Sequence, residues 1–111
     1  CDAMLGAVAA GDIGMHFPDT DPKYKDISSI KLLSETFQMV KTKGFSVLNL
    51  DTIIFAEAPK LSPYRSAMQQ NIASAINLES QRINIKATTT EGLGMIGKGA
   101  GIGAMCVAML E

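Results

Sequence analysis

The sequence predicts an α/β (α+β) domain, with helices packed on one face of a single mixed sheet. Three segments carry apolar residues at helical spacing, and three carry the apolar runs or alternation typical of strands. The expected order is helix, loop, helix, strand, helix, strand, glycine-rich loop and strand. With 111 residues, 47% of them hydrophobic, the chain fits one domain, residues 1–111, around one core.

The first residues have the pattern of a helix end. Met4, Leu5 and Val8 lie at helical spacing, and Gly11 is a plausible C-terminal cap. Because the chain begins at Cys1 within this apolar pattern, we expect an upstream segment to be missing. Residues 11–26 contain two glycines, two prolines and four aspartates, which predicts a loop.

A helix is expected next, capped by Asp26 or Ser28 and ended by Gly44. Residues at steps of three and four give it one apolar face. These residues are Ile30, Leu33, Phe37 and Val40.

Residues 45–55 are apolar at positions on both faces, which predicts a well-buried strand. A second helix follows the loop "AEAPKLSPY", with Ser62 as its cap and Pro63 at its first position. Its predicted apolar stripe consists of Tyr64, Met68, Ile72 and Ile76.

Two further strands complete the pattern. Residues 83–88 alternate between apolar and polar side chains, as in a half-buried strand. Residues 102–110 are apolar and fit a helix or a strand; their glycines favour the strand.

Composition excludes several classes of function. A net charge of −1 and the absence of tryptophan argue against nucleic-acid binding. The longest apolar stretches are too short to span a bilayer. Cys1 and Cys106 are too few for a disulfide framework, so a reduced, intracellular setting is expected.

The segment "KATTTEGLGMIGKGAG" imitates two phosphate-binding motifs. Gly92, Gly94 and Gly97 satisfy G-x-G-x-x-G, but the residues after Gly97 form a poor helix. A P-loop needs a hydroxyl residue where Gly99 stands. What remains is a general anion site of glycine amides, threonine hydroxyls, Lys98 and a metal-binding Glu91, or equally a tight turn.

The other motifs are weak in isolation. Asp12, Asp19 and Asp21 could bind sugar hydroxyls or a metal, although aspartates are also common in turns. The loop "AEAPKLSP" could contact a base and a phosphate or simply connect two elements. His16 is the only histidine, and no nucleophile–base pair is visible.

Together, "GDIG", "FPDTDP", "AEAPKL" and "KATTTEGLG", in this order, resemble the 2-C-methyl-D-erythritol 2,4-cyclodiphosphate synthase family over the whole chain. The resemblance implies an enzyme of non-mevalonate isoprenoid biosynthesis, a phosphorus–oxygen lyase. In the family's reaction, the 2-phosphate of 4-diphosphocytidyl-2-C-methyl-D-erythritol 2-phosphate attacks the β-phosphorus, and CMP leaves. The family's location is the bacterial cytoplasm or the plastid, and the bacterial cytoplasm is favoured here.

The resemblance also implies the site. Thr89 would stabilise the transition state, and Glu91 would bind magnesium or manganese. The methylerythritol end would be held by Asp12, Ile13, Gly14, Phe17, Pro18, Asp19, Thr20 and Asp21. The cytidine pocket would comprise Ala56, Glu57, Ala58, Pro59, Lys60, Leu61 and Ser62, and the phosphates would meet Thr88, Thr89, Thr90, Glu91, Met95 and Lys98.

Two departures from the family stand out. Met95 and Lys98 replace the usual aromatic residue and arginine. The catalytic zinc ligands would lie upstream of Cys1, so this fragment alone is expected to be inactive. The family forms a homotrimer with no nucleic-acid or membrane partner. The alternative is a non-enzymatic trimeric nucleotide-binding or regulatory module.

Overall fold

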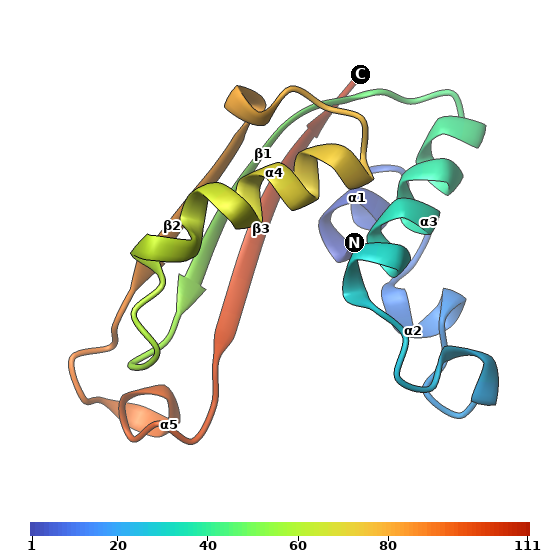
Figure 1. Ribbon diagram of the computed structural model, residues 1–111. Coiled ribbons are helices and arrows are strands. Elements are labelled where there is room, and N and C mark those ends of the chain that lie inside the picture. The colour runs from blue at the N-terminus through green and yellow to red at the C-terminus, as the bar shows by residue number, and fades with distance from the viewer.

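A three-stranded mixed sheet forms the centre of the computed structural model, which describes residues 1–111 (Figure 1). The central strand β1 (Val47–Phe55) pairs in parallel with β2 (Ile83–Thr88) and antiparallel with β3 (Gly103–Leu110). The strand order is therefore β2-β1-β3. The mixed sheet and all three predicted strands are confirmed.

Helices cover one face of this sheet. α1 (Asp2–Ala7) packs on β3, and α4 (Arg65–Ala75) packs on β2. α3 (Ser29–Thr42) packs against both of these helices (Figure 1). The predicted arrangement of helices on a single face is confirmed.

The core lies between the helices and the sheet. Leu50 of β1 is aligned with Ile83 of β2 and Ala108 of β3, so that the three strands present apolar side chains to the same side. The central cluster consists of Met4, Val8, Val40, Val47, Leu50, Ala73, Ile76, Ile83 and Ile85.

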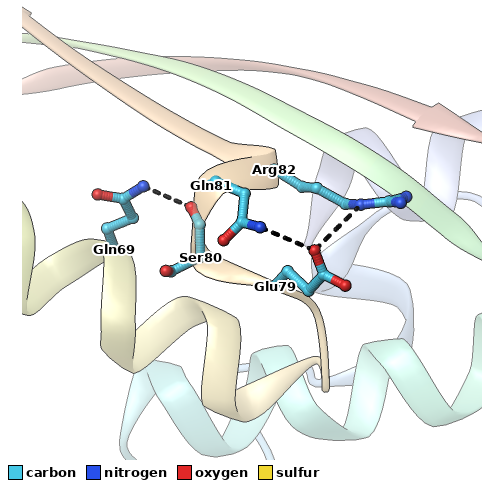
Figure 2. A network of polar contacts seen from close by, with 5 residues as sticks. All are labelled: Gln69, Glu79, Ser80, Gln81 and Arg82. Atoms are coloured by element: carbon cyan, nitrogen blue, oxygen red, sulfur yellow. Dashed lines mark hydrogen bonds and ion pairs between the residues drawn. The ribbon is translucent and has the colours of Figure 1, made fainter.

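A polar network fixes the start of β2 against α4 (Figure 2). The Gln69 amide of α4 donates to the carbonyl oxygens of Ser80 and Ile83, the latter at 2.8 Å. These bonds satisfy the backbone where the short 3-10 helix η3 (Ser80–Arg82) becomes the strand. The contact sets the position of α4 along the sheet.

The segment between α1 and α3 is more ordered than the loop that its composition predicts. α1 ends at Ala7 rather than being capped by Gly11, and Ala9 turns the chain with φ of 54°. The segment then contains α2 (Ile13–His16) and the 3-10 helix η1 (Pro22–Tyr24). Local side-chain capping, which composition does not reveal, organises it.

The predicted start of the second helix is also wrong. Ser62 does not cap α4; Ser62–Tyr64 forms a 3-10 helix, η2, that continues directly into α4 at Arg65. Tyr64 therefore lies before the helix and is 58% exposed instead of joining the apolar stripe. Ser28 precedes α3 as predicted, without a side-chain capping bond.

β1 is not buried on both faces. The face of the sheet away from the helices carries a polar cluster, in which the Asp51 carboxylate accepts from Lys86 Nζ at 2.8 Å and Asn84 Nδ2 at 3.0 Å. β3 adds exposed apolar side chains to the same face, namely Met105, Val107 and Met109. The apolar residues of this face suggested a core strand, but no helix covers them.

None of the helices combines the length and the apolar character needed to cross a lipid bilayer.

Replacing Ile83 by alanine tests the core. Ile83 is 2% exposed, so Ile83→Ala should lower the free energy of unfolding by about 2–5 kcal/mol through lost burial and the cavity left behind. Ile30→Ala is the matched control, because Ile30 is 40% exposed on α3. Chemical denaturation measures both, and equal losses would contradict the placement of the core.

Asp51 should make stability depend on pH. The hydrogen bonds from Lys86 and Asn84 lower the pKa of the Asp51 carboxyl below its ordinary value. A lowered folded-state pKa adds stability above the unfolded-state value, about 3.9, and that stability is lost as pH falls through the folded-state pKa. Denaturation of wild type and Asp51→Asn should differ at pH 7 and converge in acid; a constant difference would contradict this.

Candidate functional site

A pocket of about 420 Å³ opens where the parallel strands β1 and β2 end. Carboxyl ends of parallel strands are the usual location of ligand sites in such sheets. The loop after β1, residues 56–62, and the threonines at the end of β2 meet there. The lining residues are Ala56, Glu57, Pro59, Lys60, Leu61, Ser62, Arg65, Ala87, Thr88 and Thr89.

The loop of residues 56–62 is anchored at its start. Ala56 is buried, and its backbone N–H donates to the Thr88 carbonyl at 3.0 Å, extending the pairing of β1 with β2. Lys60 and Arg65 bring two cations to the pocket. This wall therefore combines backbone polar groups with positive charge, which suits a phosphorylated ligand.

The three threonines differ in which hydrogen-bonding capacity they have left. Thr88 Oγ1 donates to the Thr89 carbonyl at 3.1 Å, and Thr90 Oγ1 donates to the Leu93 carbonyl at 2.8 Å. Thr89 Oγ1 instead accepts from the Glu91 backbone N–H at 3.2 Å. Because a hydroxyl has one hydrogen, only Thr89 keeps its hydrogen free for a ligand.

The glycine-rich segment folds into a compact turn, residues 89–97. Glu91 and Gly92 have φ of 54° and 80°, and the one-turn helix α5 (Gly94–Gly97) follows. A Cβ on Gly97 would lie 2.1 Å from the Gly92 carbonyl carbon, so only glycine permits this approach. α5 ends at Gly97, where a dinucleotide-binding helix would have to begin.

A carboxylate joins the two halves of the pocket. Glu57 Oε1 accepts from the Gly92 backbone N–H at 2.6 Å across 35 residues of sequence. Glu57 thereby ties the loop of residues 56–62 to the glycine turn.

The residues present fit magnesium better than zinc. The Glu91 side chain is exposed and makes no hydrogen bond or ion pair, so its oxygens are free for a hard cation such as magnesium. Zinc prefers nitrogen and sulfur ligands, and the chain brings together no group of three or more His, Cys, Asp or Glu side chains. The only histidine, His16, donates from Nε2 to the Ala10 carbonyl at 2.6 Å.

The predicted methylerythritol-binding residues lie elsewhere, around α2 and η1. In Figure 1, α2 is beside α3 and far from α5. The Asp12 and Asp21 carboxylates cap α2 and η1 by accepting from Met15 N at 2.9 Å and Lys23 N at 3.0 Å. Within one chain this group, which comprises Asp12, Ile13, Gly14, Phe17, Pro18, Asp19, Thr20 and Asp21, does not border the pocket.

Some of the predicted cytidine and phosphate residues also do not line the pocket. They are Ala58 of the predicted cytidine loop and Thr90, Glu91, Met95 and Lys98 of the predicted phosphate group. Met95 is 76% exposed.

Sequence reasoning missed two side chains. Arg65 lines the pocket, and a cation in the first turn of a helix, against the helix dipole, was a signal that could have identified it. The second is Asp2, whose Oδ1 accepts from Ile13 N at 2.7 Å and so orients the "GDIG" turn. Nothing in the sequence pattern indicated that contact.

Comparison with known proteins gives a uniform result. The model of the YgbB family matches residues 1–111. The 2-C-methyl-D-erythritol 2,4-cyclodiphosphate synthase of Desulfatibacillum aliphaticivorans is 56% identical over the whole chain, which spans 72% of that protein. The synthase of Desulforamulus reducens is 57% identical over 99% of the chain, which spans 70% of that protein.

Solved structures agree in fold. The bifunctional IspDF from Campylobacter jejuni superposes with a TM-score of 0.91 at 45% identity, covering 98% of this chain and 29% of that one. A 2C-methyl-D-erythritol-2,4-cyclodiphosphate synthase in a CDP-bound form gives 0.89 at 33% identity, covering 99% of this chain and 71% of that one.

The close contact of Gly97 with Gly92 provides a test of the glycine turn. Gly97→Ala forces the turn apart and should lower the free energy of unfolding by about 1–3 kcal/mol. Gly101→Ala is the matched control, since a Cβ at Gly101 meets nothing within 4 Å. Thermal unfolding measures both variants, and a Gly97→Ala protein as stable as Gly101→Ala would contradict the close approach.

Proposed function

Since the chain belongs to the YgbB family, the 2-C-methyl-D-erythritol 2,4-cyclodiphosphate synthases, we propose that its pocket binds the cytidine diphosphate part of the substrate. The observation that carries the proposal is the meeting of the loop of residues 56–62 with the threonines of β2 in one pocket. Backbone groups of the loop would face cytosine, and the cations and hydroxyls would face phosphate. A similar structure described as CDP-bound supports a nucleotide of this kind.

The chemistry requires no protein nucleophile. An oxygen of the substrate's 2-phosphate forms a bond to the β-phosphorus, and the bond from that phosphorus to the bridging oxygen breaks. CMP leaves with the electron pair. Catalysis of such a step depends on holding the two phosphates in line and compensating their charge.

The residues of the chain divide this work. Thr89 donates its free hydroxyl hydrogen to a phosphate oxygen on which charge develops. Lys60 and Arg65 lie on the same wall and neutralise the diphosphate and the departing CMP. The pocket thus stabilises both the attacked group and the leaving group.

Metal ions and a second subunit are proposed to complete the active site. Glu91 would hold a magnesium or manganese ion, which supplies charge neutralisation between phosphates. Zinc would be bound by residues upstream of Cys1. A homotrimer would bring the group around Asp12 of one subunit to the pocket of another, and a cytoplasmic location stays a prediction.

Thr89→Ala tests the proposal in the full-length protein that contains this chain. Loss of one preorganised donor should reduce kcat by about 100-fold or more, measured as CMP release. Calorimetric titration with CMP, and with UMP as the control ligand, should give saturable binding that prefers CMP in both wild type and variant. Thr89→Ser keeps the hydroxyl and should recover most of the activity.

Two outcomes would contradict the proposal. Wild-type turnover by Thr89→Ala would remove this hydroxyl from the mechanism. A folded protein that binds CMP without converting substrate would instead indicate a non-enzymatic nucleotide-binding module.

A further inference from the structure

We propose that Glu57 is a positioning residue that couples the nucleotide loop to the glycine turn and so places Thr89 and Glu91 for the reaction. The proposal rests on the proposed function and adds a role for a side chain beyond direct contact with cytidine. Glu57 acts through the backbone of the turn and not on the reacting atoms.

The contact is specific to this side chain. Residues 56–62 make one hydrogen bond to the turn of residues 89–97, and it is the 2.6 Å bond from Gly92 N to Glu57 Oε1. The only other link nearby joins Ala56 N to the Thr88 carbonyl, at the end of the strand pairing. Glu57 therefore supplies the one hydrogen bond that ties the loop of residues 56–62 to the turn.

The turn needs such an attachment. Glu91 adopts φ of 54°, a left-handed conformation that residues with a side chain rarely adopt, and Gly92 continues in the same region. The carboxylate binds the N–H at this point, and hydrogen bonds from an amide to an ionised acceptor are stronger than neutral ones. Glu57 therefore stabilises the turn where its backbone conformation is least favourable.

The glycine turn also determines the orientation of the Thr89 hydroxyl and the Glu91 carboxylate. Thr89 Oγ1 accepts from Glu91 N at 3.2 Å, so the orientation of the Thr89 hydroxyl depends on the Thr90–Glu91 peptide, which adjoins the peptide that Glu57 binds at Gly92 N. The carboxylate of Glu91 is carried by the residue directly before Gly92. A shift of Gly92 thus moves the donor and the proposed metal ligand together.

Glu57 also lines the pocket with Lys60 and Arg65. The proposed nucleotide loop and the proposed phosphate turn are therefore joined by a side chain at their common boundary. This one bond therefore fixes the phosphate turn relative to the nucleotide loop.

Three variants of the full-length protein test the coupling. Glu57→Ala removes the acceptor, and Glu57→Gln keeps an acceptor oxygen without the charge. Glu79→Ala is the control, because Glu79 is an exposed glutamate beside the start of β2, at the opposite end of that strand (Figure 2). Amide hydrogen exchange of Gly92, turnover of the substrate and calorimetric binding of CMP are measured for each.

In Glu57→Ala, we expect the exchange of the Gly92 amide to accelerate about tenfold or more, because its acceptor is lost. We expect kcat to fall by about tenfold or more, and the Kd for CMP to change by a clearly smaller factor, because the backbone of the loop remains in place. Glu57→Gln should recover a large part of both losses, and Glu79→Ala should match wild type.

The failure of this inference differs from failure of the proposed function. Unchanged Gly92 exchange in Glu57→Ala, or equal effects on kcat and CMP binding, would overturn the positioning role. A wild-type protein that neither turns over substrate nor binds CMP would overturn the proposed function itself, whatever happens to the Gly92 amide.

Discussion

The parallel pairing of β1 with β2 is the constraint on which the rest of the site depends. Two parallel strands end at the same edge of a sheet, and Phe55 is aligned here with Thr88. The loop of residues 56–62 and the glycine turn consequently leave the sheet side by side. An antiparallel pairing of the same strands would place them at opposite ends, and no pocket could form between them.

Parallel pairing requires a crossover, which α4 provides. The helix buries Ala73 and Ile76 follows it into the core, while Gln69 binds the backbone at the start of β2. The position of β2 along β1 is thus fixed at its amino end by α4. At its carboxyl end, the Ala56–Thr88 bond and the Glu57–Gly92 bond continue the same alignment into the loops. Packing far from the pocket therefore determines the geometry inside it.

Much of this was predictable because periodicity reflects burial. The alternation of residues 83–88 located β2, and two of the four quoted motifs, "AEAPKL" and "KATTTEGLG", contain residues that line the pocket. Hydrogen bonds that depend on one dihedral angle were not predictable. Ser62 is a residue type that often caps helices, yet the chain enters α4 through a 3-10 turn in which the Ser62 side chain makes no capping bond. Arg65 reaches the pocket for the same reason, since the turn decides which way the first residue of the helix faces.

The exposure of one face of β1 could not be predicted either. An apolar strand face that is left uncovered within one chain has the same sequence pattern as a face that is buried in the core. Met105, Val107 and Met109 form an exposed apolar row beside the polar cluster of Asp51, Asn84 and Lys86.

The uncovered face of the sheet and the separation of the two groups of predicted site residues have a common explanation in an assembly of several copies. Within one chain the group around Asp12 does not border the pocket at Thr89, so under the proposed function a substrate that contacts both would do so across two copies. A closed assembly in which the open faces of the sheets meet would cover the apolar row and repeat the pocket at every boundary. The proposed homotrimer satisfies both conditions with a single symmetry operation. In such an assembly the exposed apolar row of β3 would matter to the active site as much as the threonines in the pocket. The contacts of this row would determine which neighbouring copy supplies the group around Asp12.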